Sequence, residues 1–407
     1  MLNNQTLLYC INIVLCVIAL GLLVPSTILF IECMASLLPN RSQAENFQSP
    51  KPRTTVLVPA HNEAPTITLT LDTLLPQLTD RDKLVVIADN CTDETAVVVR
   101  NLGATAIERQ DQEHRGKGYA LDYGLRFLEK DPPEVVIFVD ADCLVEAGTV
   151  ERISRLAATL GRPVQATYLM KPPTNPGTKD LVSALAVMVS NLVRPSGLAK
   201  LGLPCVLRGT GMAFPWSVIS KVPLASSNLV EDLQLGLDLA IAGHPPVFCR
   251  DGKLTAVLPQ QGQAAKGQRT RWEHGSLQTM FTQVPRLLKI AVLQRRFDLF
   301  ANALDLCVPP LSLLVMMWAA ATGGALLVGV LEAVWLPVLL LTLAGFMIIF
   351  SIIGAWAKFG RADLPLLTLL AVPFYILWKI PLYLAFLVRP QTEWIRTKRD
   401  VVESSES

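Results

Sequence analysis

Long apolar stretches near both ends of the chain constrain its fold more than any other feature. Between residues 7 and 38 the one charged residue is Glu32, and this stretch exceeds the roughly 20 apolar residues that a helix needs to cross a bilayer. The residues before it carry no Lys or Arg, and the apolar run is too long for a secretory signal peptide. We therefore expect residues 1–39 to form a retained N-terminal transmembrane anchor.

The C-terminal part of the chain predicts further membrane helices. Residues 304–330, 335–357 and 364–388 are apolar stretches that are each long enough to span a bilayer. These stretches and the N-terminal one explain why 51% of the residues are hydrophobic and only 17% are charged. We expect transmembrane helices within residues 301–389 and a polar tail at residues 390–407.

Basic residues predict which side of the membrane each segment faces. Residues 281–300 mix aliphatic and basic side chains, which predicts an amphipathic helix at the cytosolic interface. Lys and Arg near the membrane ends favour the cytosolic side, yet four crossings would place the basic C-terminal tail outside. Either one apolar stretch is re-entrant or interfacial, or the tail breaks the rule. We favour the former, because polar, basic tails usually stay in the cytosol.

The region between the apolar stretches has the pattern of an α/β domain. Residues 40–53 are polar and contain two prolines, which predicts a linker. Within residues 54–280, the runs TTVLVPA, KLVVIADN and EVVIFVDAD each end in polar residues and precede helix-compatible sequence. This alternation predicts a mostly parallel sheet with helices on both faces and a ligand site at the carboxyl ends of the strands. With a net charge of +2 and scattered basic residues, nothing favours nucleic acid as a partner.

Two carboxylates follow one of the predicted strands. Asp140 and Asp142 come directly after the run VVIFV, and at a strand end both can face one divalent cation. Mg²⁺ or Mn²⁺ held by few carboxylates completes its shell with substrate phosphates, so a nucleoside diphosphate is a natural ligand. The alternative is that these residues only form a turn, since strands often end in Asp.

Other polar residues also follow predicted strands or begin helices. Asp89 and Glu63 could accept hydrogen bonds from a nucleotide, although the residues after Asp89 also suit helix capping. Lys117 lies in a glycine-flanked turn that suits a phosphate, or forms only a basic surface turn. Of the adjacent Glu231 and Asp232, at most one is expected to point into a cleft while the other favours the helix dipole.

The segment QRTRW, residues 268–272, supplies an amide, a planar cation and an aromatic ring close together. Such a set suits a pyrophosphate and a sugar ring. The alternative is an amphipathic anchor near the membrane surface, where Arg and Trp are common.

Taken in order, VPAHNE, ADNCTD, RGKGYAL, DAD, ED and QRTRW resemble the motifs of the family 2 inverting glycosyltransferases. This group contains the bacterial cellulose, hyaluronan and poly-N-acetylglucosamine synthases. The resemblance covers nearly the whole chain, and it implies a GT-A fold, a Rossmann-like nucleotide-sugar domain, joined to transmembrane helices. It also implies a multi-pass protein of a bacterial inner or plasma membrane with its catalytic domain in the cytosol.

The resemblance also implies a role for each motif. Five residues are assigned by position to the donor or the metal. Glu63 and Asp89 would bind the base and ribose, and Lys117 would lie near the donor. Asp140 would bind the nucleotide and the metal, and Asp142 the metal. The remaining roles are the general base Asp232, the donor clamp of Gln268, Arg271 and Trp272, the acceptor loop of Gly209, Thr210 and Gly211, and an acceptor contact of Trp272.

The implied reaction is a single displacement on a nucleotide-sugar, which is expected to be a UDP-sugar. An acceptor hydroxyl attacks the anomeric carbon, Asp232 takes its proton, and the configuration inverts because no covalent intermediate forms. The expected acceptor is a growing polysaccharide of the cell envelope or a lipid-linked saccharide, with export proteins as possible partners. VED instead of TED, and a small membrane region, also allow a single transfer to a lipid.

Two other classes of protein share part of this pattern. A sugar nucleotidyltransferase has the same α/β plan and acidic metal site, but it needs neither membrane helices nor the ED and QxxRW motifs. A non-catalytic membrane accessory subunit would not need every acidic residue of the mechanism. The presence of those acidic residues and motifs favours the glycosyltransferase.

Overall fold

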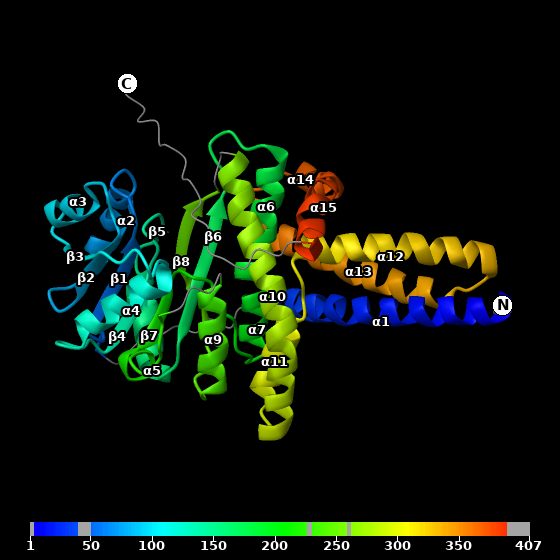
Figure 1. Cartoon of the computed structure of the whole chain (residues 1–407), viewed down its shortest axis with the longest axis horizontal. Coiled ribbons are helices and arrows are strands. Elements are labelled where there is room, and N and C mark those ends of the chain that lie inside the picture. The colour runs from blue at the N-terminus through cyan, green and yellow to red at the C-terminus, as the bar shows by residue number, and fades with distance from the viewer. Residues whose placement is uncertain (1–3, 40–49, 226–229, 259–261, 389–407) are drawn as a thin grey trace. The chain divides into compact units, whose positions relative to one another are not determined.

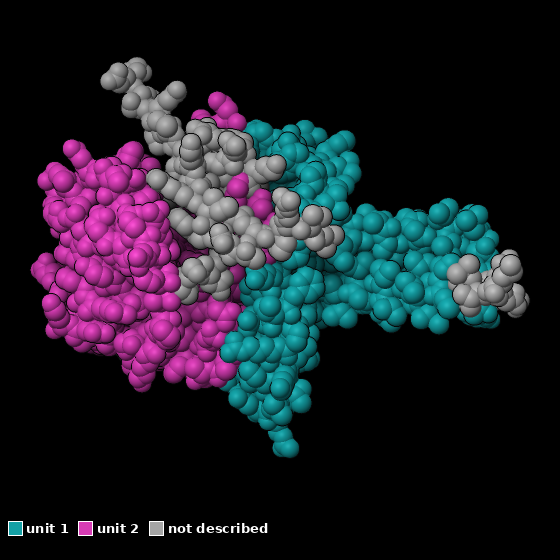
Figure 2. Space-filling view, viewed as in Figure 1, with its two compact units in different colours: residues 1–39, 176–201, 276–390 teal, residues 40–175, 202–275, 391–407 magenta. Residues whose placement is uncertain are grey.

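The chain divides into two compact units, which Figure 2 draws in different colours. The computed structural model describes residues 4–39, 50–225, 230–258 and 262–388. Unit 1 contains residues 1–39, 176–201 and 276–390, and unit 2 contains residues 40–175, 202–275 and 391–407. Most of the predicted linker at residues 40–53 and all of the predicted tail at residues 390–407 lie outside the described residues.

Unit 2 is built on one mixed sheet of eight strands in the order β3-β2-β1-β4-β7-β6-β8-β5 (Figure 1). β3, β2, β1 and β4 are parallel, whereas β7 is antiparallel to both β4 and β6, β8 is parallel to β6, and β5 is antiparallel to β8. The strands are β1 Thr54–Ala60, β2 Lys83–Asp89, β3 Thr105–Arg109, β4 Val135–Phe138, β5 Leu144–Val145, β6 Val164–Lys171, β7 Met212–Pro215 and β8 Val247–Val257. The prediction of a parallel α/β sheet is confirmed for the first half and replaced by mixed pairing in the second.

Apolar strands form this sheet because both of its faces are buried. Val56 and Val58 of β1 belong to one core, while Leu57, between them, belongs to the other, as the two-residue period of a strand requires. Helices flank the strands: α2 Ile67–Leu74, η1 Leu75–Gln77, α3 Thr95–Asn101, α4 Lys117–Leu128, α5 Thr149–Leu160, α8 Trp216–Ile219, α9 Glu231–Ile241 and the first part of α10 Gly262–Gln294.

Unit 1 consists of helices. In chain order they are α1 Asn4–Leu37, α6 Thr178–Met188, η2 Val189–Val193, α7 Arg194–Lys200, the rest of α10, α11 Phe297–Leu306, α12 Leu311–Glu332, α13 Leu336–Ala355, η3 Trp356–Gly360, α14 Leu367–Leu370 and α15 Val372–Val388. The long apolar helices α1, α12 and α13 lie side by side (Figure 1). Within the described residues, four helices are long and apolar enough to cross a membrane: Leu8–Leu37, Thr178–Lys200, Leu311–Glu332 and Leu336–Gly360.

This set of helices differs from the predicted one in three places. The apolar stretch at residues 364–388 is not one helix but α14 followed by α15, whose 17 residues fall short of the roughly 20 that a span needs. The segment at residues 281–300 is not a separate helix either, because it comprises the end of α10 and the start of α11. Thr178–Lys200, in contrast, is a candidate span that the sequence did not reveal.

A buried ion cluster joins three helices of unit 1. Nε of Arg194 in α7 donates to Oε2 of Glu32 in α1 at 2.6 Å, and its NH2 group donates to Oδ1 of Asp305 in α11 at 2.5 Å. The side chains of all three residues are at most 10% exposed. One helical turn after Arg194, Gly197 packs so closely that an added Cβ would lie 1.9 Å from the carbonyl oxygen of Glu32. The cluster therefore depends on a glycine at this position.

Candidate functional site

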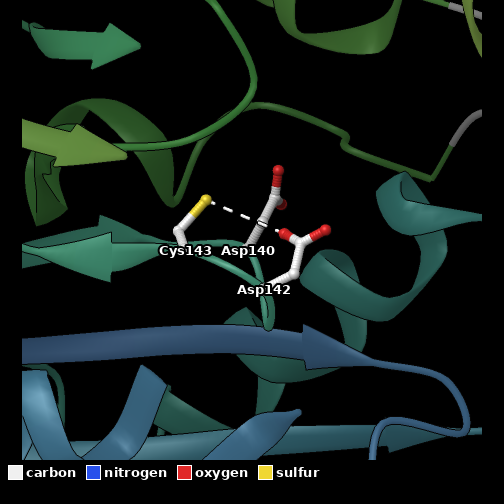
Figure 3. Close-up of side chains that lie close together, drawn as sticks. All are labelled: Asp140, Asp142 and Cys143. Atoms are coloured by element: carbon white, nitrogen blue, oxygen red, sulfur yellow. Dashed lines mark hydrogen bonds between the residues drawn. The ribbon is translucent and has the colours of Figure 1, made fainter. Parts of the chain in front are cut away.

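Two carboxylates stand together beyond the end of strand β4. The ligand atoms of Asp140, Asp142 and Cys143 lie within 4.8 Å of one another. Figure 3 shows the two carboxylates beside each other, with the Cys143 thiol donating a hydrogen bond to Oδ1 of Asp142 at 3.8 Å. Asp140 and Asp142, the predicted pair, thus lie together at the carboxyl end of β4.

The glycine-containing loop before β7 lies against this strand end. The backbone N–H of Asp140 donates to Oγ1 of Thr210 at 3.0 Å, and the N–H of Gly211 donates to the carbonyl of Phe138 at 2.9 Å. Gly209 and Gly211 have φ values of +84° and +66°, which favour glycine. At Gly211 a Cβ would also lie 2.4 Å from Leu254, so the loop needs a glycine there.

Lys117 connects the loop to the carboxylates. At the start of helix α4, its Nζ forms an ion pair with Asp140 and donates to the carbonyl oxygen of Gly209 at 2.7 Å. Burial by itself lowers the pKa of Lys117, but the carboxylates of Asp140, Glu231 and Asp232 more than offset burial, so its pKa is raised. The lysine therefore stays protonated as a fixed cation in the centre of the site.

Both acids at the start of α9 belong to this site. A Cβ on Gly209 would lie 3.4 Å from Oδ2 of Asp232, so this carboxylate lies alongside the loop. Burial raises the pKa of Glu231 to about 7, helped by the charge of Asp232. Burial also raises the pKa of Asp232, although the cation of Lys117 opposes the shift. The expectation that at most one of the two acids points into a cleft stays a prediction.

Helix α10 brings a second cation. Burial lowers the pKa of Arg271, while the carboxylates of Glu231, Asp140 and Asp232 act in the opposite direction, so its guanidinium lies within electrostatic range of the same acids. Nε of Arg271 is buried and has no hydrogen-bond partner among the described residues. Trp272 is half-buried on the same helix, and Gln268 lies one turn earlier, with its side chain outside what the structure describes.

Asp89 lies at the end of β2, beside a residue that the sequence did not single out. Its Oδ1 accepts a hydrogen bond from NH1 of Arg109 at 2.6 Å, and both side chains are almost completely buried. Arg109 ends strand β3 and is the register partner of Asp89 in the parallel pair. Only an alignment of the two strands could have indicated this contact.

Glu63 takes part in building the loop after β1. Its carbonyl oxygen accepts hydrogen bonds from the N–H groups of Thr66 and Ile67 at 2.9 Å, and its carboxylate accepts one from Oγ1 of Thr66 at 2.7 Å. The side chain is 3% exposed. Its predicted contact with a nucleotide stays a prediction, and these bonds support a structural role at the start of α2.

The donor set of the acidic pair fits Mg²⁺ or Mn²⁺. Hard divalent cations prefer oxygen ligands, and Asp140 and Asp142 supply carboxylates from one turn. Burial and the two carboxylates raise the pKa of Cys143 well above its usual value, and hard cations such as Mg²⁺ or Mn²⁺ prefer the carboxylate oxygens to its sulfur. Two protein ligands leave positions for phosphate oxygens, and the buried Nε of Arg271 is a donor without a hydrogen-bond partner among the described residues.

The fold is that of a GT-A-like glycosyltransferase. A mannosyltransferase from Pyrobaculum calidifontis, solved in complex with GDP-Man and Mn²⁺, matches with a TM-score of 0.53 and 21% identity. The match covers 86% of this chain and 99% of that one. The family described as "Glycosyltransferase like family 2" matches residues 52–275, which is more than half of the chain. The chain therefore belongs to this glycosyltransferase family.

Two curated relatives are also named as glycosyltransferases. The chain is 27% identical over 228 residues to the uncharacterized glycosyltransferase YaiP of Escherichia coli (strain K12), with 53% of this chain and 54% of that protein covered. It is 24% identical over 271 residues to the probable glycosyltransferase YdaM of Bacillus subtilis (strain 168), with 61% of each covered. The chain thus spans between half and two thirds of the length of these relatives.

Proposed function

We propose that this chain is a membrane-bound, inverting glycosyltransferase that moves a sugar from a nucleotide-sugar, expected to be a UDP-sugar, to a growing polysaccharide or a lipid-linked acceptor. One observation carries the proposal. Lys117 and the carboxylates of Asp140 and Asp232 lie together at the loop of Gly209, and Arg271 lies within electrostatic range of the same carboxylates. A diphosphate leaving group and a hydroxyl nucleophile need these charges at the same place.

Each residue of the site has a separate role in this proposal. Asp232, with its raised pKa, accepts the proton of the acceptor hydroxyl as its oxygen attacks the anomeric carbon. Lys117 and Arg271 neutralise the charge that builds on the departing diphosphate. Asp140 and Asp142 would hold Mg²⁺ or Mn²⁺, which supplies Lewis-acid stabilisation of the diphosphate when bound. Because this scheme has one base and no protein nucleophile, the configuration at the anomeric carbon inverts.

The membrane location rests on the helices of unit 1. Four described helices are long and apolar enough to cross a bilayer, and large apolar side chains of α1, α12 and α13 are exposed, including Ile13, Leu327 and Phe350. We place the family domain in the cytosol and the helices in a bacterial inner or plasma membrane. In this proposal residues 1–39 and 301–389 remain the membrane part, Thr178–Lys200 is added to it, and residues 281–300 belong to α10 and α11.

The test measures sugar transfer from a panel of radiolabelled UDP- and GDP-sugars, using membranes that contain the protein. We expect metal-dependent incorporation into a polymer or lipid fraction that EDTA removes and Mn²⁺ restores. Asp142→Asn should raise the Mn²⁺ concentration for half-maximal rate by about tenfold or more, as loss of a ligand to a charged partner implies. Asp131→Asn, which changes an exposed ion-paired carboxylate, is the matched control.

The outcomes separate the candidate functions. Chains of many sugars in the product indicate processive synthesis, whereas a single added sugar on a lipid indicates the simpler transfer. No turnover with any donor, in membranes where the protein still binds nucleotide, contradicts catalysis and favours an accessory role. EDTA-resistant turnover contradicts the assignment of Asp140 and Asp142 to a metal.

The pH dependence of transfer tests the acidic pair of α9. A general base with a raised pKa is protonated at low pH, so kcat/KM should fall as the pH drops through the raised pKa values of the pair, of which that of Glu231 is about 7. In Glu231→Gln the acidic limb should move to lower pH, because the neighbouring negative charge is gone. Initial rates between pH 5 and 9 at saturating metal measure the shift, and Glu151→Gln, which changes an exposed carboxylate of α5, is the control. An unmoved acidic limb argues against coupling of Glu231 to the base.

A further inference from the structure

The contact between Arg109 and Asp89 fixes the carboxylate that we expect at the base of the donor. NH1 of Arg109 donates to Oδ1 of Asp89, while its NH2 group donates to Oδ2 of Asp111 at 2.9 Å and to the carbonyl of His114 at 2.8 Å. The guanidinium also lies 5.8 Å from the centre of the Tyr119 ring. With three acceptors and a ring around it, Arg109 has little freedom to leave Asp89.

As a result, the two oxygens of the Asp89 carboxylate are not equivalent. Oδ1 accepts hydrogen bonds from Arg109 and from Nδ2 of Asn90, at 2.6 and 3.1 Å. Oδ2 has no hydrogen bond to any residue that the structure describes, and the side chain keeps 12% of its surface exposed. Asp89 therefore offers a ligand one acceptor oxygen and not two.

Nucleotide bases differ in the number of donors that they present to a carboxylate. Uracil has one ring N–H between two carbonyl oxygens. Guanine has two adjacent donors, its ring N–H and its amino group, which pair with both oxygens of one carboxylate. At Asp89, guanine would leave one donor unpaired or displace Arg109 from a buried ion pair, and either outcome costs binding free energy.

We propose that Arg109 is a positioning residue that makes this site select uracil over guanine by holding Oδ1 of Asp89. The inference rests on the proposed function, because it takes Asp89 to contact the base of the donor. It narrows the donor to a UDP-sugar. It also separates this chain from the mannosyltransferase that was solved with GDP-Man.

The test measures the affinities of UDP, GDP and CDP for the full-length protein in detergent with Mn²⁺, by isothermal titration calorimetry. The wild type should bind UDP at least about tenfold more tightly than GDP, the effect of one hydrogen bond to a charged group. In Arg109→Met this ratio should fall by about tenfold, and Arg109→Lys should recover part of it. Arg100→Met removes an exposed ion pair with Glu108, the neighbour of Arg109 in β3, and should leave the UDP-to-GDP affinity ratio unchanged.

A second variant keeps the test decisive if Arg109→Met does not fold. In Asp89→Asn, Arg109 holds the amide oxygen, so the NH₂ group takes the open position and faces the base. Uracil N–H then meets a donor, whereas the ring nitrogen of cytosine is an acceptor, so the preference should move from UDP to CDP.

The outcomes distinguish the inference from the function on which it rests. Equal or tighter binding of GDP by the wild type, or an unchanged UDP-to-GDP ratio in Arg109→Met, overturns the role of Arg109 and leaves the glycosyltransferase standing. A preference for UDP that persists in Asp89→Asn overturns the role of Arg109 in the same way. A wild-type protein that binds no nucleoside diphosphate overturns both.

Discussion

Asp232→Asn should lower the turnover of sugar transfer by about 10²–10⁴-fold, the range that loss of a general base produces. The amide cannot take the proton of the acceptor hydroxyl, but it keeps the size of the side chain beside Gly209. Nucleotide binding should persist, because the cations and the acids after β4 are unchanged. A stopped-time radiochemical assay at saturating donor measures the loss, and calorimetric titration with UDP measures binding.

The same helix offers the matched control for this variant. Asp238 lies in α9 and accepts a hydrogen bond from Gln234 at 2.8 Å, so Asp238→Asn makes the same chemical change within the helix. It should retain nearly full turnover. If Asp232→Asn keeps more than about a tenth of the wild-type rate, Asp232 is not the general base. An equal loss in both variants would indicate damage to α9 and not to the chemistry.

Gly197→Ala should strongly destabilise unit 1. The added Cβ would lie 1.9 Å from the carbonyl oxygen and 2.7 Å from the carbonyl carbon of Glu32, so two helix backbones must separate. That movement pulls Arg194 away from Glu32 and leaves buried charges without partners. We expect the free energy of unfolding to fall by about 3 kcal/mol or more, which is the upper end of the range typical of overpacking. The midpoint of thermal unfolding in detergent and the yield of monodisperse protein measure it.

Another helical glycine provides the comparison. At Gly323 in α12, a Cβ would meet nothing within 4 Å. Gly323→Ala should therefore leave stability unchanged or raise it slightly, since Ala favours a helix over Gly by about 1 kcal/mol. Unfolding midpoints that match between the two variants would mean that α1 and α7 do not pack as closely as the structure indicates.

Much of unit 2 could be predicted from the sequence, because its strands are short apolar runs that end in polar residues. The runs that contain Val56, Val86 and Ile137 became β1, β2 and β4 for that reason. The mixed second half could not be predicted. β5 has only two residues, and the pairing of β6 with β7 and β8 depends on contacts far apart in the chain.

The same limit explains what the sequence missed in the site and in the helices. Asp140 and Asp142 could be recognised because they are neighbours in the chain, whereas Arg109 meets Asp89 only through strand register. Thr178–Lys200 escaped notice because its mean hydropathy is 1.4, against 2.7 for Leu8–Leu37. Part of that polarity comes from Arg194, which Glu32 and Asp305 neutralise in the folded protein.

The chain enters unit 1 in the middle of the catalytic sheet, since α6, η2 and α7 come between strands β6 and β7. Trimming both ends of the polypeptide therefore yields a fragment that is not free of apolar helices. Such a fragment would still carry 23 residues of apolar helix between two strands of its core. During synthesis, strands β7 and β8 follow this helix, so the sheet cannot be completed before Thr178–Lys200 has been made.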